Sequence, residues 1–497
     1  MKSSQKLTLN RGFSVLEVLI ALAILTLGIS AAILIVFGNQ SLKIDNETNG
    51  EALYKAKSLL ERARASSTLD FISINTTATT SEDIYSKKFN VADVSPCAKD
   101  LTSVVNWLSS FRPLEIQLTT RVTSLDEAEK LGGFCDPVAP ESAWDKPNAF
   151  DIVSPSDFGG KGTGIAVAYL NGIRYVFLTT DSANKENFWS IDTTDPQNID
   201  IDNDAHGIMA GEKGLNGITI AGNYAYVLNN DTSSHLLVVD ITNPLDPKHL
   251  IDASSTIIGL TNGRAKSIFY YDKKIYVGTE FVSPTLNNEF YIFDVSTPDD
   301  PEQEASIKVN RNVNSIVVRD GIAYLAIGSG SSNPYTPLRA YNVDQNSTQY
   351  LQKVGEYATT TNWHGTSLYL LGSKLYFGLE RKSPSSQLAP EFLIFDTANL
   401  NEPIGSKELN LTPQSSAGVS GVVVQGHLAF LVTTASNARL FILNVSSSAK
   451  PEIIKSKCKT APLPQNATGL VYSDNLLFLS IKDNEAFRII YNELSCS

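Results

Sequence analysis

The feature that most constrains the fold is a unit that recurs seven times between residue 144 and the C-terminal end. Each copy contains an apolar strand, a two-residue turn, a second apolar strand with an aromatic residue, a polar loop, and a third strand ending in Asp or Asn. The clearest copy is residues 217–244. A strand-rich repeat of this kind predicts a β-propeller in which each copy supplies one blade.

Two sets of residues recur with the unit, at spacings of 48 to 54 residues. The aromatic residues of the second strands are Tyr175, Tyr226, Tyr276, Tyr324, Tyr376, Phe430 and Phe478. The polar residues that end the third strands are Asp192, Asp240, Asp294, Asn342, Asp396, Asn444 and Asn492. We expect the aromatic set to pack between blades and the polar set to cap turns. A ring of acidic ligands is the less favoured alternative for the polar set.

The last copy ends without a fourth strand. In the clearest complete copy the third strand is followed by NPLDPKHLIDA, and a matching piece, Asp145–Val153, precedes the first copy. We predict that residues 145–153 supply the missing outer strand and close the ring, which would remove exposed sheet edges. The propeller is therefore expected to cover residues 144–497.

The N-terminal segment combines a basic start with a long apolar run. Residues 1–12 contain three cations and no acid, and the apolar run from Phe13 to Phe37 contains one carboxylate, Glu17. The run is long enough to span a bilayer. An ionised side chain in a membrane helix costs about 3 kcal/mol on insertion scales. Glu17 therefore needs a partner from outside the run, and the nearest candidate is a chain terminus.

The sequence GFSVLE at residues 12–17 resembles the cleavage and methylation site of type IV prepilins and type II secretion pseudopilins. The resemblance implies that a prepilin peptidase cuts after Gly12 and N-methylates Phe13. It also implies that Glu17 pairs with the Phe13 amine of a neighbouring pilin or pseudopilin subunit. The alternatives are a signal anchor with a chance Glu, or a cleavable secretory signal, whose apolar core should be shorter.

The helical pattern continues beyond the apolar run. Apolar residues recur at three- and four-residue spacing from Leu53 to Ala63, so we expect one helix over residues 13–66, with its first half in the inner membrane. Residues 67–143, with an alternating strand pattern at 114–122, are expected to form a small pilin-like head. The predicted fold class is an α+β pilin-like N-terminal part, with a long helix and a small β head, followed by an all-β seven-bladed propeller.

Three third strands resemble a second family. The segments LLVVD at 236–240, YIFDV at 291–295 and FLIFD at 392–396 are similar to the LVIVD repeats of bacterial and archaeal surface proteins. Those repeats are thought to build propellers. The resemblance covers about 350 residues, but each copy is loose and says little about the ligand.

Four cysteines are present, at Cys97, Cys135, Cys458 and Cys496. None forms a CxxC pair, which argues against a zinc site. Disulfides persist in exported proteins, and four cysteines allow three connectivities. We favour the pairs 97–135 and 458–496, because each closes a loop within one domain.

A weak calcium signal lies in the first repeat. Carboxylates occur at alternate positions, as in calcium loops: Asp200, Asp202 and Asp204. Ala205 stands where such loops usually have Gly, and Glu212 falls one position late for the usual bidentate ligand. The stretch also lies where the first repeat needs its outer strand, with Ile199 and Ile201 facing inward. We therefore expect no cofactor, with calcium as the minor alternative.

Charge and histidine content limit the classes of function. The formal net charge is −12, and loss of the leader cations Lys2, Lys6 and Arg11 would make it −15. This argues against nucleic acid as a partner. The histidines are scattered and have no ligand spacing on a shared element: His206, His235, His249, His364 and His427. No residue pattern indicates an enzyme.

The sequence favours a minor pilin or pseudopilin that assembles into a pilus through its N-terminal helix and displays a propeller for adhesion or partner binding. Its expected ligand is an extracellular protein or glycan. A repeat region of this size has a radius of gyration of roughly 20 Å, which would crowd a filament if every subunit carried it. Two alternatives remain: a type II secretion pseudopilus component that binds exported substrates, and a membrane-tethered extracellular propeller enzyme. The expected location is the inner membrane as a single-pass precursor, then a cell-surface pilus or periplasmic pseudopilus.

Overall fold

The chain divides into two compact units, and each is described by itself. The computed structural model describes residues 15–109, 112–133, 144–150, 158–231, 235–250, 263–285, 287–328, 335–360, 362–381, 390–411, 417–435, 440–454, 467–482 and 486–492. The first unit comprises Met1–Val91 and Asp100–Val122, and the second comprises Ala92–Lys99 and Thr123–Ser497. The sequence predicted a single boundary at residue 144. The structure instead assigns Ala92–Lys99 and the residues from Thr123 onward to the second unit.

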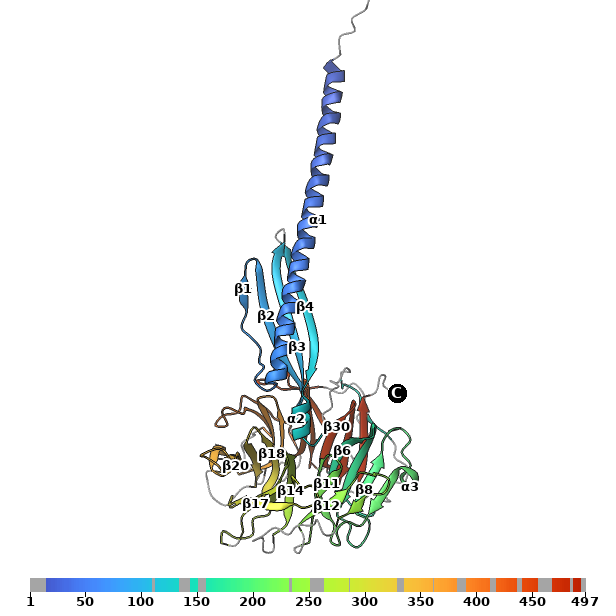
Figure 1. Ribbon diagram of the computed structural model, residues 1–497, viewed down its shortest axis with the longest axis vertical. Coiled ribbons are helices and arrows are strands. Elements are labelled where there is room, and N and C mark those ends of the chain that lie inside the picture. Colours follow the sequence, from blue (N-terminus) through green and yellow to red (C-terminus); the bar gives the residue numbers. More distant parts are fainter. Residues whose placement is uncertain are drawn as a thin grey trace, which may run out of the picture. The chain divides into compact units, whose positions relative to one another are not determined.

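The first unit is built on one long helix, α1 (Val15–Leu69). It continues without interruption through Gly28, Gly38 and Gly50 (Figure 1). At 1.5 Å per residue, its 55 residues extend over about 80 Å. The helix predicted over residues 13–66 is confirmed from Val15 onward and ends three residues later than expected.

A four-stranded sheet packs on the C-terminal half of this helix. Its order is β1 (Thr80–Glu82), β2 (Tyr85–Ser95), β3 (Ala98–Ser109) and β4 (Arg112–Thr123). The strand predicted over 114–122 lies within β4. Ala52 and Ala56 are fully buried beneath Tyr85, Val105 and Trp107, because small side chains let the sheet approach the helix closely.

Polar contacts join the same helix to the sheet. The Tyr85 hydroxyl donates to the Thr48 carbonyl at 3.1 Å. Arg112 donates to Asp45 at 2.9 Å, and Lys55 donates to Glu82 at 2.7 Å. Hydrogen bonds from Lys55 and Lys87 hold the pKa of Glu82 at about 2. The carboxylate of Glu82 is therefore charged at every physiological pH.

In the second unit, the described residues form seven four-stranded antiparallel sheets. The first four, in strand order, are β6 (Gly162–Leu170), β7 (Ile173–Thr180), β8 (Phe188–Asp192), β9 (Ala205–Ile208); β10 (Leu215–Ala221), β11 (Tyr224–Asn229), β12 (Leu236–Asp240), β13 (Lys248–His249); β14 (Ala265–Tyr271), β15 (Lys274–Thr279), β16 (Phe290–Asp294), β17 (Glu302–Ile307); and β18 (Val313–Arg319), β19 (Ile322–Ile327), β20 (Tyr335–Asn342), β21 (Lys353–Thr359).

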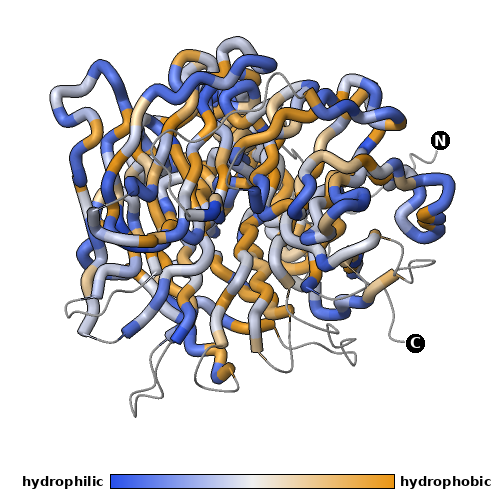
Figure 2. The backbone as a smooth tube through the Cα atoms, turned by 90° about the horizontal axis from the view of Figure 1, so that it is seen from below, coloured by the Kyte–Doolittle hydropathy of each residue, from blue (hydrophilic) through white to orange (hydrophobic). Residues whose placement is uncertain are grey.

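The remaining three sheets continue the pattern. They are β22 (Trp363–Leu371), β23 (Lys374–Arg381), β24 (Phe392–Asp396), β25 (Gly405–Lys407); β26 (Val419–Gln425), β27 (Leu428–Thr433), β28 (Leu440–Asn444), β29 (Glu452–Ile453); and β30 (Ala467–Ser473), β31 (Leu476–Ile481), β32 (Phe487–Asn492), β5 (Pro147–Ala149). The first strand of each sheet contacts the first strand of the next, and β30 contacts β6, so the sheets form a closed, propeller-like ring. Apolar residues follow the strands, and many connecting loops are hydrophilic (Figure 2).

The ring closes through the strand that precedes the first repeat. β5 pairs antiparallel with β32, with Ala149 opposite Ile490 and Pro147 opposite Asn492. Phe150 stacks on Tyr491 with ring centroids 4.0 Å apart. The predicted closing strand is confirmed for the described residues of 145–153, and residues 151–153 lie outside them.

The repeated residues, with the exception of Asn492, have the structural roles predicted for them. All seven second-strand aromatics are buried in the core clusters between sheets. Of the polar residues, six accept a hydrogen bond from the backbone N–H two positions later, at 2.7–3.1 Å: Asp192, Asp240, Asp294, Asn342, Asp396 and Asn444. Their side chains therefore fix the turn that follows six of the third strands. The Oδ1 of the seventh residue, Asn492, is buried and has no hydrogen-bond partner among the described residues.

A repeated β-bulge near the start of each first strand was not predicted. The bulged residues are Thr163, Asn216, Lys266, Asn314, Thr366, Ser420 and Thr468. Five of them donate to a backbone carbonyl of the next sheet at 2.6–2.8 Å, as Asn216 does to Ala265. These side chains therefore join neighbouring sheets.

The residue after each bulged position is small, either Gly or Ser. The close contact between neighbouring sheets at Gly164 shows why a larger residue does not fit there. A Cβ atom at Gly164 would lie 2.9 Å from the Cα of Gly217 in the neighbouring sheet. We expect Gly164→Val to destabilise the ring by about 1–3 kcal/mol, the usual cost of overpacking. The measurement is urea denaturation followed by circular dichroism. Ile173→Val, at an exposed position of β7, is the control, and equal stability of the two variants would contradict the close-packing argument.

Candidate functional site

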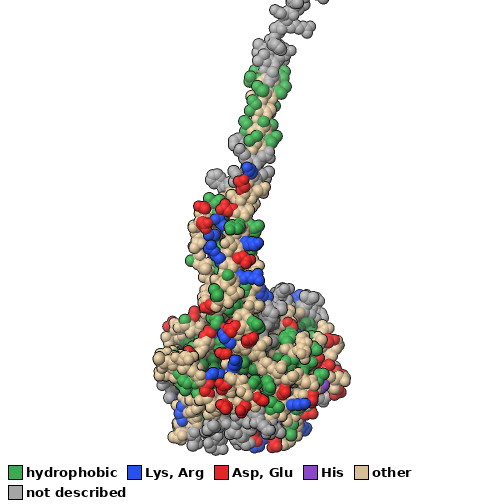
Figure 3. All heavy atoms as spheres, in the orientation of Figure 1, with side chains coloured by type: hydrophobic (Ala, Val, Ile, Leu, Met, Phe, Trp, Pro, Cys, Tyr) green, Lys and Arg blue, Asp and Glu red, His purple; other side chains and the backbone are tan. Residues whose placement is uncertain are grey.

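The N-terminal segment is the first candidate site. Gly12 and Phe13 lie outside the described residues, and Glu17 lies within α1 with its side chain also outside them. The helix that follows carries large apolar side chains with exposed fractions of 48–73%, seen along α1 in Figure 3. These side chains are Leu19, Ile20, Leu22, Ile24, Leu25, Leu27, Ile29, Ile33, Leu34, Ile35 and Val36. An apolar surface of this extent marks an interaction site.

Within the part of the chain that the structure describes, no helix combines the length and apolarity needed to cross a membrane. The transmembrane segment predicted over residues 13–37 includes residues outside that part and stays a prediction.

The calcium candidate folds into a capped helical turn. Asp200 is the N-cap of α3 (Ile201–Asp204), and its Oδ1 accepts from the Asp202 N–H at 3.1 Å. Asp204 Oδ2 accepts from the Asp200 N–H at 2.8 Å. Among the described residues, no group of three His, Cys, Asp or Glu side chains is placed to hold a metal ion.

The same turn corrects one expectation about the first repeat. Ile199 and Ile201 are buried, as predicted. The outer strand, however, is β9 at Ala205–Ile208, after the acidic stretch rather than within it. The cause is local, because the Asp200 side chain caps the backbone and starts a helical turn instead of continuing a strand.

Cys97 is buried and disulfide-bonded. Cys135, Cys458 and Cys496 lie outside the described residues. The pairings 97–135 and 458–496 stay predictions.

Two buried acids of the repeats accept hydrogen bonds from the backbone. Glu289 Oε2 accepts from the Val309 and Asn310 N–H groups at 2.8 and 2.7 Å. Glu391 Oε2 accepts from the Leu409 N–H at 2.8 Å. Burial raises the pKa of Glu289, and the two backbone donors oppose that effect. Both residues immediately precede a third strand, so their position in the repeat gives them a structural role.

A second candidate site lies where two early segments cover one face of the sheets. We call residues 92–99 and 124–133 the cover, and both belong to the second unit. The Gly222 N–H donates to the Gly132 carbonyl at 2.8 Å, and the Asp272 N–H donates to the Lys130 carbonyl at 2.7 Å. The Gly426 N–H donates to Val94 at 2.7 Å. These three donors come from the turns between the first and second strands of three sheets, so the cover occupies the face that those turns form.

The sequence of the cover explains its shape. In α2 (Leu125–Lys130), the Ser124 Oγ accepts from the Glu127 N–H at 3.2 Å, which caps the helix. After the helix, Gly132 has a φ of 92°, and a Cβ there would lie 2.4 Å from the Ile220 carbonyl oxygen. Only glycine permits this approach of the cover to the sheet.

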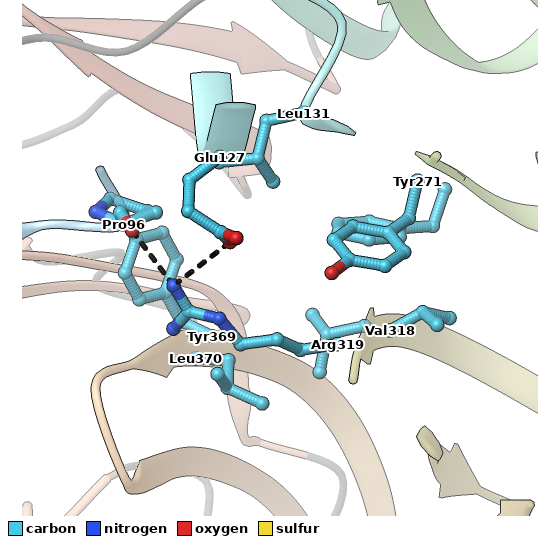
Figure 4. Close-up of a pocket in the computed structure, with 10 residues that line it drawn as sticks. Pro96, Glu127, Leu131, Tyr271, Val318, Arg319, Tyr369 and Leu370 are labelled. Carbon is cyan, nitrogen blue, oxygen red and sulfur yellow. Dashed lines mark hydrogen bonds and ion pairs between the residues drawn. The ribbon is translucent and has the colours of Figure 1, made fainter. Parts of the chain in front are cut away.

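A buried ion pair lies under the cover (Figure 4). Glu127 is 3% exposed, and its Oε1 accepts from Lys130 at 2.9 Å. Arg319 Nη2 lies 3.8 Å from Glu127 Oε2 and donates to the Pro96 carbonyl at 2.7 Å. Burial lowers the pKa of Lys130, but its hydrogen bonds to Asp126 and Glu127 outweigh this and raise it. Arg319 thereby links both segments of the cover to β18.

Beside this ion pair lies a cavity of about 130 Å³. Its walls are mainly apolar and include Leu131, Phe269, Val317, Tyr369 and Leu370. Tyr271 also lines it, and burial together with the nearby Glu127 raises the pKa of its hydroxyl to about 12. Glu127 Oε2 is buried and has no hydrogen-bond partner among the described residues.

Neither the cover nor this cavity was predicted from the sequence. The signals that could have located the helix of the cover are the pattern Ser124-Leu-Asp-Glu127, typical of a capping box, and the Gly132-Gly133 pair at its end. No local signal indicates what α2 packs against. The contact partners, such as Arg319, lie about 190 residues away in the chain.

Comparisons with known sequence families match two parts of the chain. Residues 8–33 match a family described as a prokaryotic N-terminal methylation motif. Residues 216–249 match the LVIVD repeat. Both resemblances inferred from the sequence are confirmed. No curated protein matches the chain.

Solved structures with some similarity share little sequence. BamB from Moraxella catarrhalis is 12% identical, with 68% of this chain and 84% of that chain covered and a TM-score of 0.39. A quinonprotein alcohol dehydrogenase-like protein from Bacteroides thetaiotaomicron is 11% identical, with coverage of 72% and 82% and a TM-score of 0.38. The computationally designed Ika8 protein is 9% identical, with coverage of 65% and 81% and a TM-score of 0.42.

Proposed function

We propose that this chain, which carries an N-terminal methylation motif and an LVIVD repeat, is a minor type IV pilin or pseudopilin that displays a seven-bladed propeller. The observation that carries the proposal is the match to the methylation motif over residues 8–33. In this proposal the prepilin peptidase cuts after Gly12 and methylates Phe13. Glu17 then pairs with the Phe13 amine of a neighbouring subunit as the filament assembles.

The form of the first unit supports this role. The 55-residue α1 directly follows the proposed cleavage point and exposes apolar side chains from Leu19 to Val36. Before assembly, this surface would lie in the inner membrane. After assembly, it would be buried against the helices of neighbouring subunits. The sheet of β1–β4, packed on the C-terminal half of the helix, supports the assignment of a small pilin-like head.

The second unit is proposed as the recognition domain. Seven four-stranded sheets among the described residues, closed by the pairing of β5 with β32, support the count of seven blades. The cover occupies one face, so we expect an extracellular protein or glycan to bind the opposite face. The buried acids Glu289 and Glu391 accept hydrogen bonds from backbone amides, which supports a structural role for these two residues.

The bulk of the propeller favours a minor subunit over a major one. A domain of this size has a radius of gyration of roughly 20 Å. A tightly packed filament would be crowded if every subunit carried such a domain. A position at the tip, or at sparse intervals, leaves room for it. The mature product would be located on a cell-surface pilus or a periplasmic pseudopilus.

The test is mass spectrometry of the N-terminus of the protein recovered from sheared surface filaments. We expect a chain that begins with N-methylated Phe13. A prepilin peptidase deletion strain is the control and should retain the uncleaved precursor in the membrane fraction. An intact N-terminus at Met1 in the wild-type strain, confined to membranes, would contradict the proposal and favour a tethered propeller.

A further inference from the structure

The cavity under the cover has polar groups on one side and apolar walls elsewhere. Glu127 Oε2 is buried and lacks a hydrogen-bond donor. The Tyr271 hydroxyl accepts from the Asp320 N–H at 3.5 Å, so its own hydrogen is available to donate. Figure 4 shows the Glu127 carboxylate and the Tyr271 hydroxyl directed toward the space between them. A few convergent polar groups in an apolar cavity are typical of a small-molecule site.

The charges around Glu127 indicate what kind of group is missing. Lys130 donates to Oε1 at 2.9 Å, and Arg319 lies 3.8 Å from Oε2. Lys130 also lies 2.7 Å from Asp126 Oδ2, so two cations face two carboxylates and a third cation would add repulsion. A neutral group with one hydrogen to donate would satisfy Oε2 without changing the charge balance. Leaving a buried acceptor without a donor is unfavourable.

The size of the cavity limits the rest of the ligand. Its volume is about 130 Å³. An apolar cavity of about 150 Å³ in another protein stays dry and binds benzene. The volume therefore suits a single six-membered ring. Phe269 and Tyr369 in the lining offer aromatic surface for such a ring.

We propose that this cavity binds a hydroxyphenyl group. The hydroxyl donates to Glu127 Oε2 and accepts from the Tyr271 hydroxyl, and the ring packs against the apolar walls. The group belongs either to a small phenolic molecule or to a tyrosine side chain of a partner chain. This inference does not depend on the role of the chain in a filament.

The test measures binding of p-cresol and of toluene to the full chain in detergent by isothermal titration calorimetry. The two probes differ only by the hydroxyl. We expect p-cresol to bind 10- to 100-fold more tightly than toluene, because a hydrogen bond to a charged acceptor contributes about that much. Absence of saturable binding of p-cresol would overturn the proposal.

Three variants locate the binding. Leu131→Trp fills the cavity from a half-buried position of the cover and should abolish p-cresol binding. Leu125→Trp, at a 75%-exposed position of the cover, is the matched control and should bind as the wild type does. Glu127→Gln keeps the shape and weakens the acceptor, so the preference for p-cresol over toluene should fall several-fold. Unchanged p-cresol binding in Leu131→Trp, with an unchanged melting temperature, would place the site elsewhere.

Competition identifies the source of the group. Displacement of p-cresol by N-acetyl-tyrosine amide would support a tyrosine side chain as the natural occupant. Binding of p-cresol without competition from the tyrosine derivative would support a small phenolic molecule, because the amide-bearing backbone would not fit under the cover. Both results support binding of a hydroxyphenyl group, and they distinguish a tyrosine side chain from a small phenolic molecule as its source.

Discussion

Replacement of Trp144 by alanine is expected to destabilise the second unit by about 3–5 kcal/mol, the range for removing a large buried aromatic side chain. Trp144 is 1% exposed and lies edge-on to Phe430, with ring centroids 5.0 Å apart. Its Nε1 donates to Asn475 Oδ1 at 3.0 Å. The side chain therefore anchors the start of the segment that leads into β5, and its loss weakens the closure of the ring.

The measurement is urea denaturation of the full chain followed by circular dichroism of the strands. Trp144→Phe keeps an aromatic ring and loses the indole hydrogen bond, so a smaller loss of about 1 kcal/mol is expected. Hydrogen exchange adds a second readout, because β32 should exchange faster in Trp144→Ala while β14 stays protected. Equal protection of β32 in the wild type and in Trp144→Ala would show that β5 does not depend on this anchor.

Replacement of Glu17 by valine is expected to leave membrane insertion and cleavage intact and to reduce incorporation into filaments at least tenfold. Valine fits the apolar run better than a carboxylate does, so insertion should not suffer. Incorporation should fall because the Phe13 amine of a neighbouring subunit would have no charge partner in an apolar environment. An unpaired charge there costs about 3 kcal/mol, and 1.4 kcal/mol already corresponds to a tenfold change.

The measurement is quantitative immunoblotting of sheared filaments against the membrane fraction. Glu17→Asp keeps the charge and should retain part of the incorporation. Glu61→Val changes an exposed glutamate on the same helix and should behave as the wild type. Normal incorporation of Glu17→Val would remove the pairing argument and would leave the methylation motif as a processing signal only.

Local patterns predicted the elements that depend on local causes. The helix over residues 13–66 followed from three- and four-residue spacing, and α1 has that form from Val15. The second-strand aromatics and the third-strand Asp and Asn residues followed from their recurrence, and Tyr226 and Asp240 have the expected roles. The closing strand could be predicted because an incomplete last repeat needs a partner. The structure places β5 on β32 accordingly.

The sequence-based predictions failed where one side chain changes the backbone conformation, or where a residue packs against a segment distant in the chain. At Asp200, a cap turned an expected strand into α3 and moved the outer strand to β9. The bulge in each first strand was missed, although the tripeptides Leu215-Asn-Gly and Val313-Asn-Ser carry a recurring polar-small signal. Hydrophobic alternation does not distinguish a bulged strand from a regular one.

The sequence by itself determined the helix, the repeat and the residues that end each strand, because these depend on contacts between residues close in the chain or on a period that is visible in it. Only the tertiary structure decided where the cover lies and what it encloses. Glu127, Tyr271 and Arg319 come together across nearly 200 residues, and nothing local to any of them specifies the others. A cavity is the space left when distant surfaces pack, so its position and chemistry follow from the fold and not from a motif.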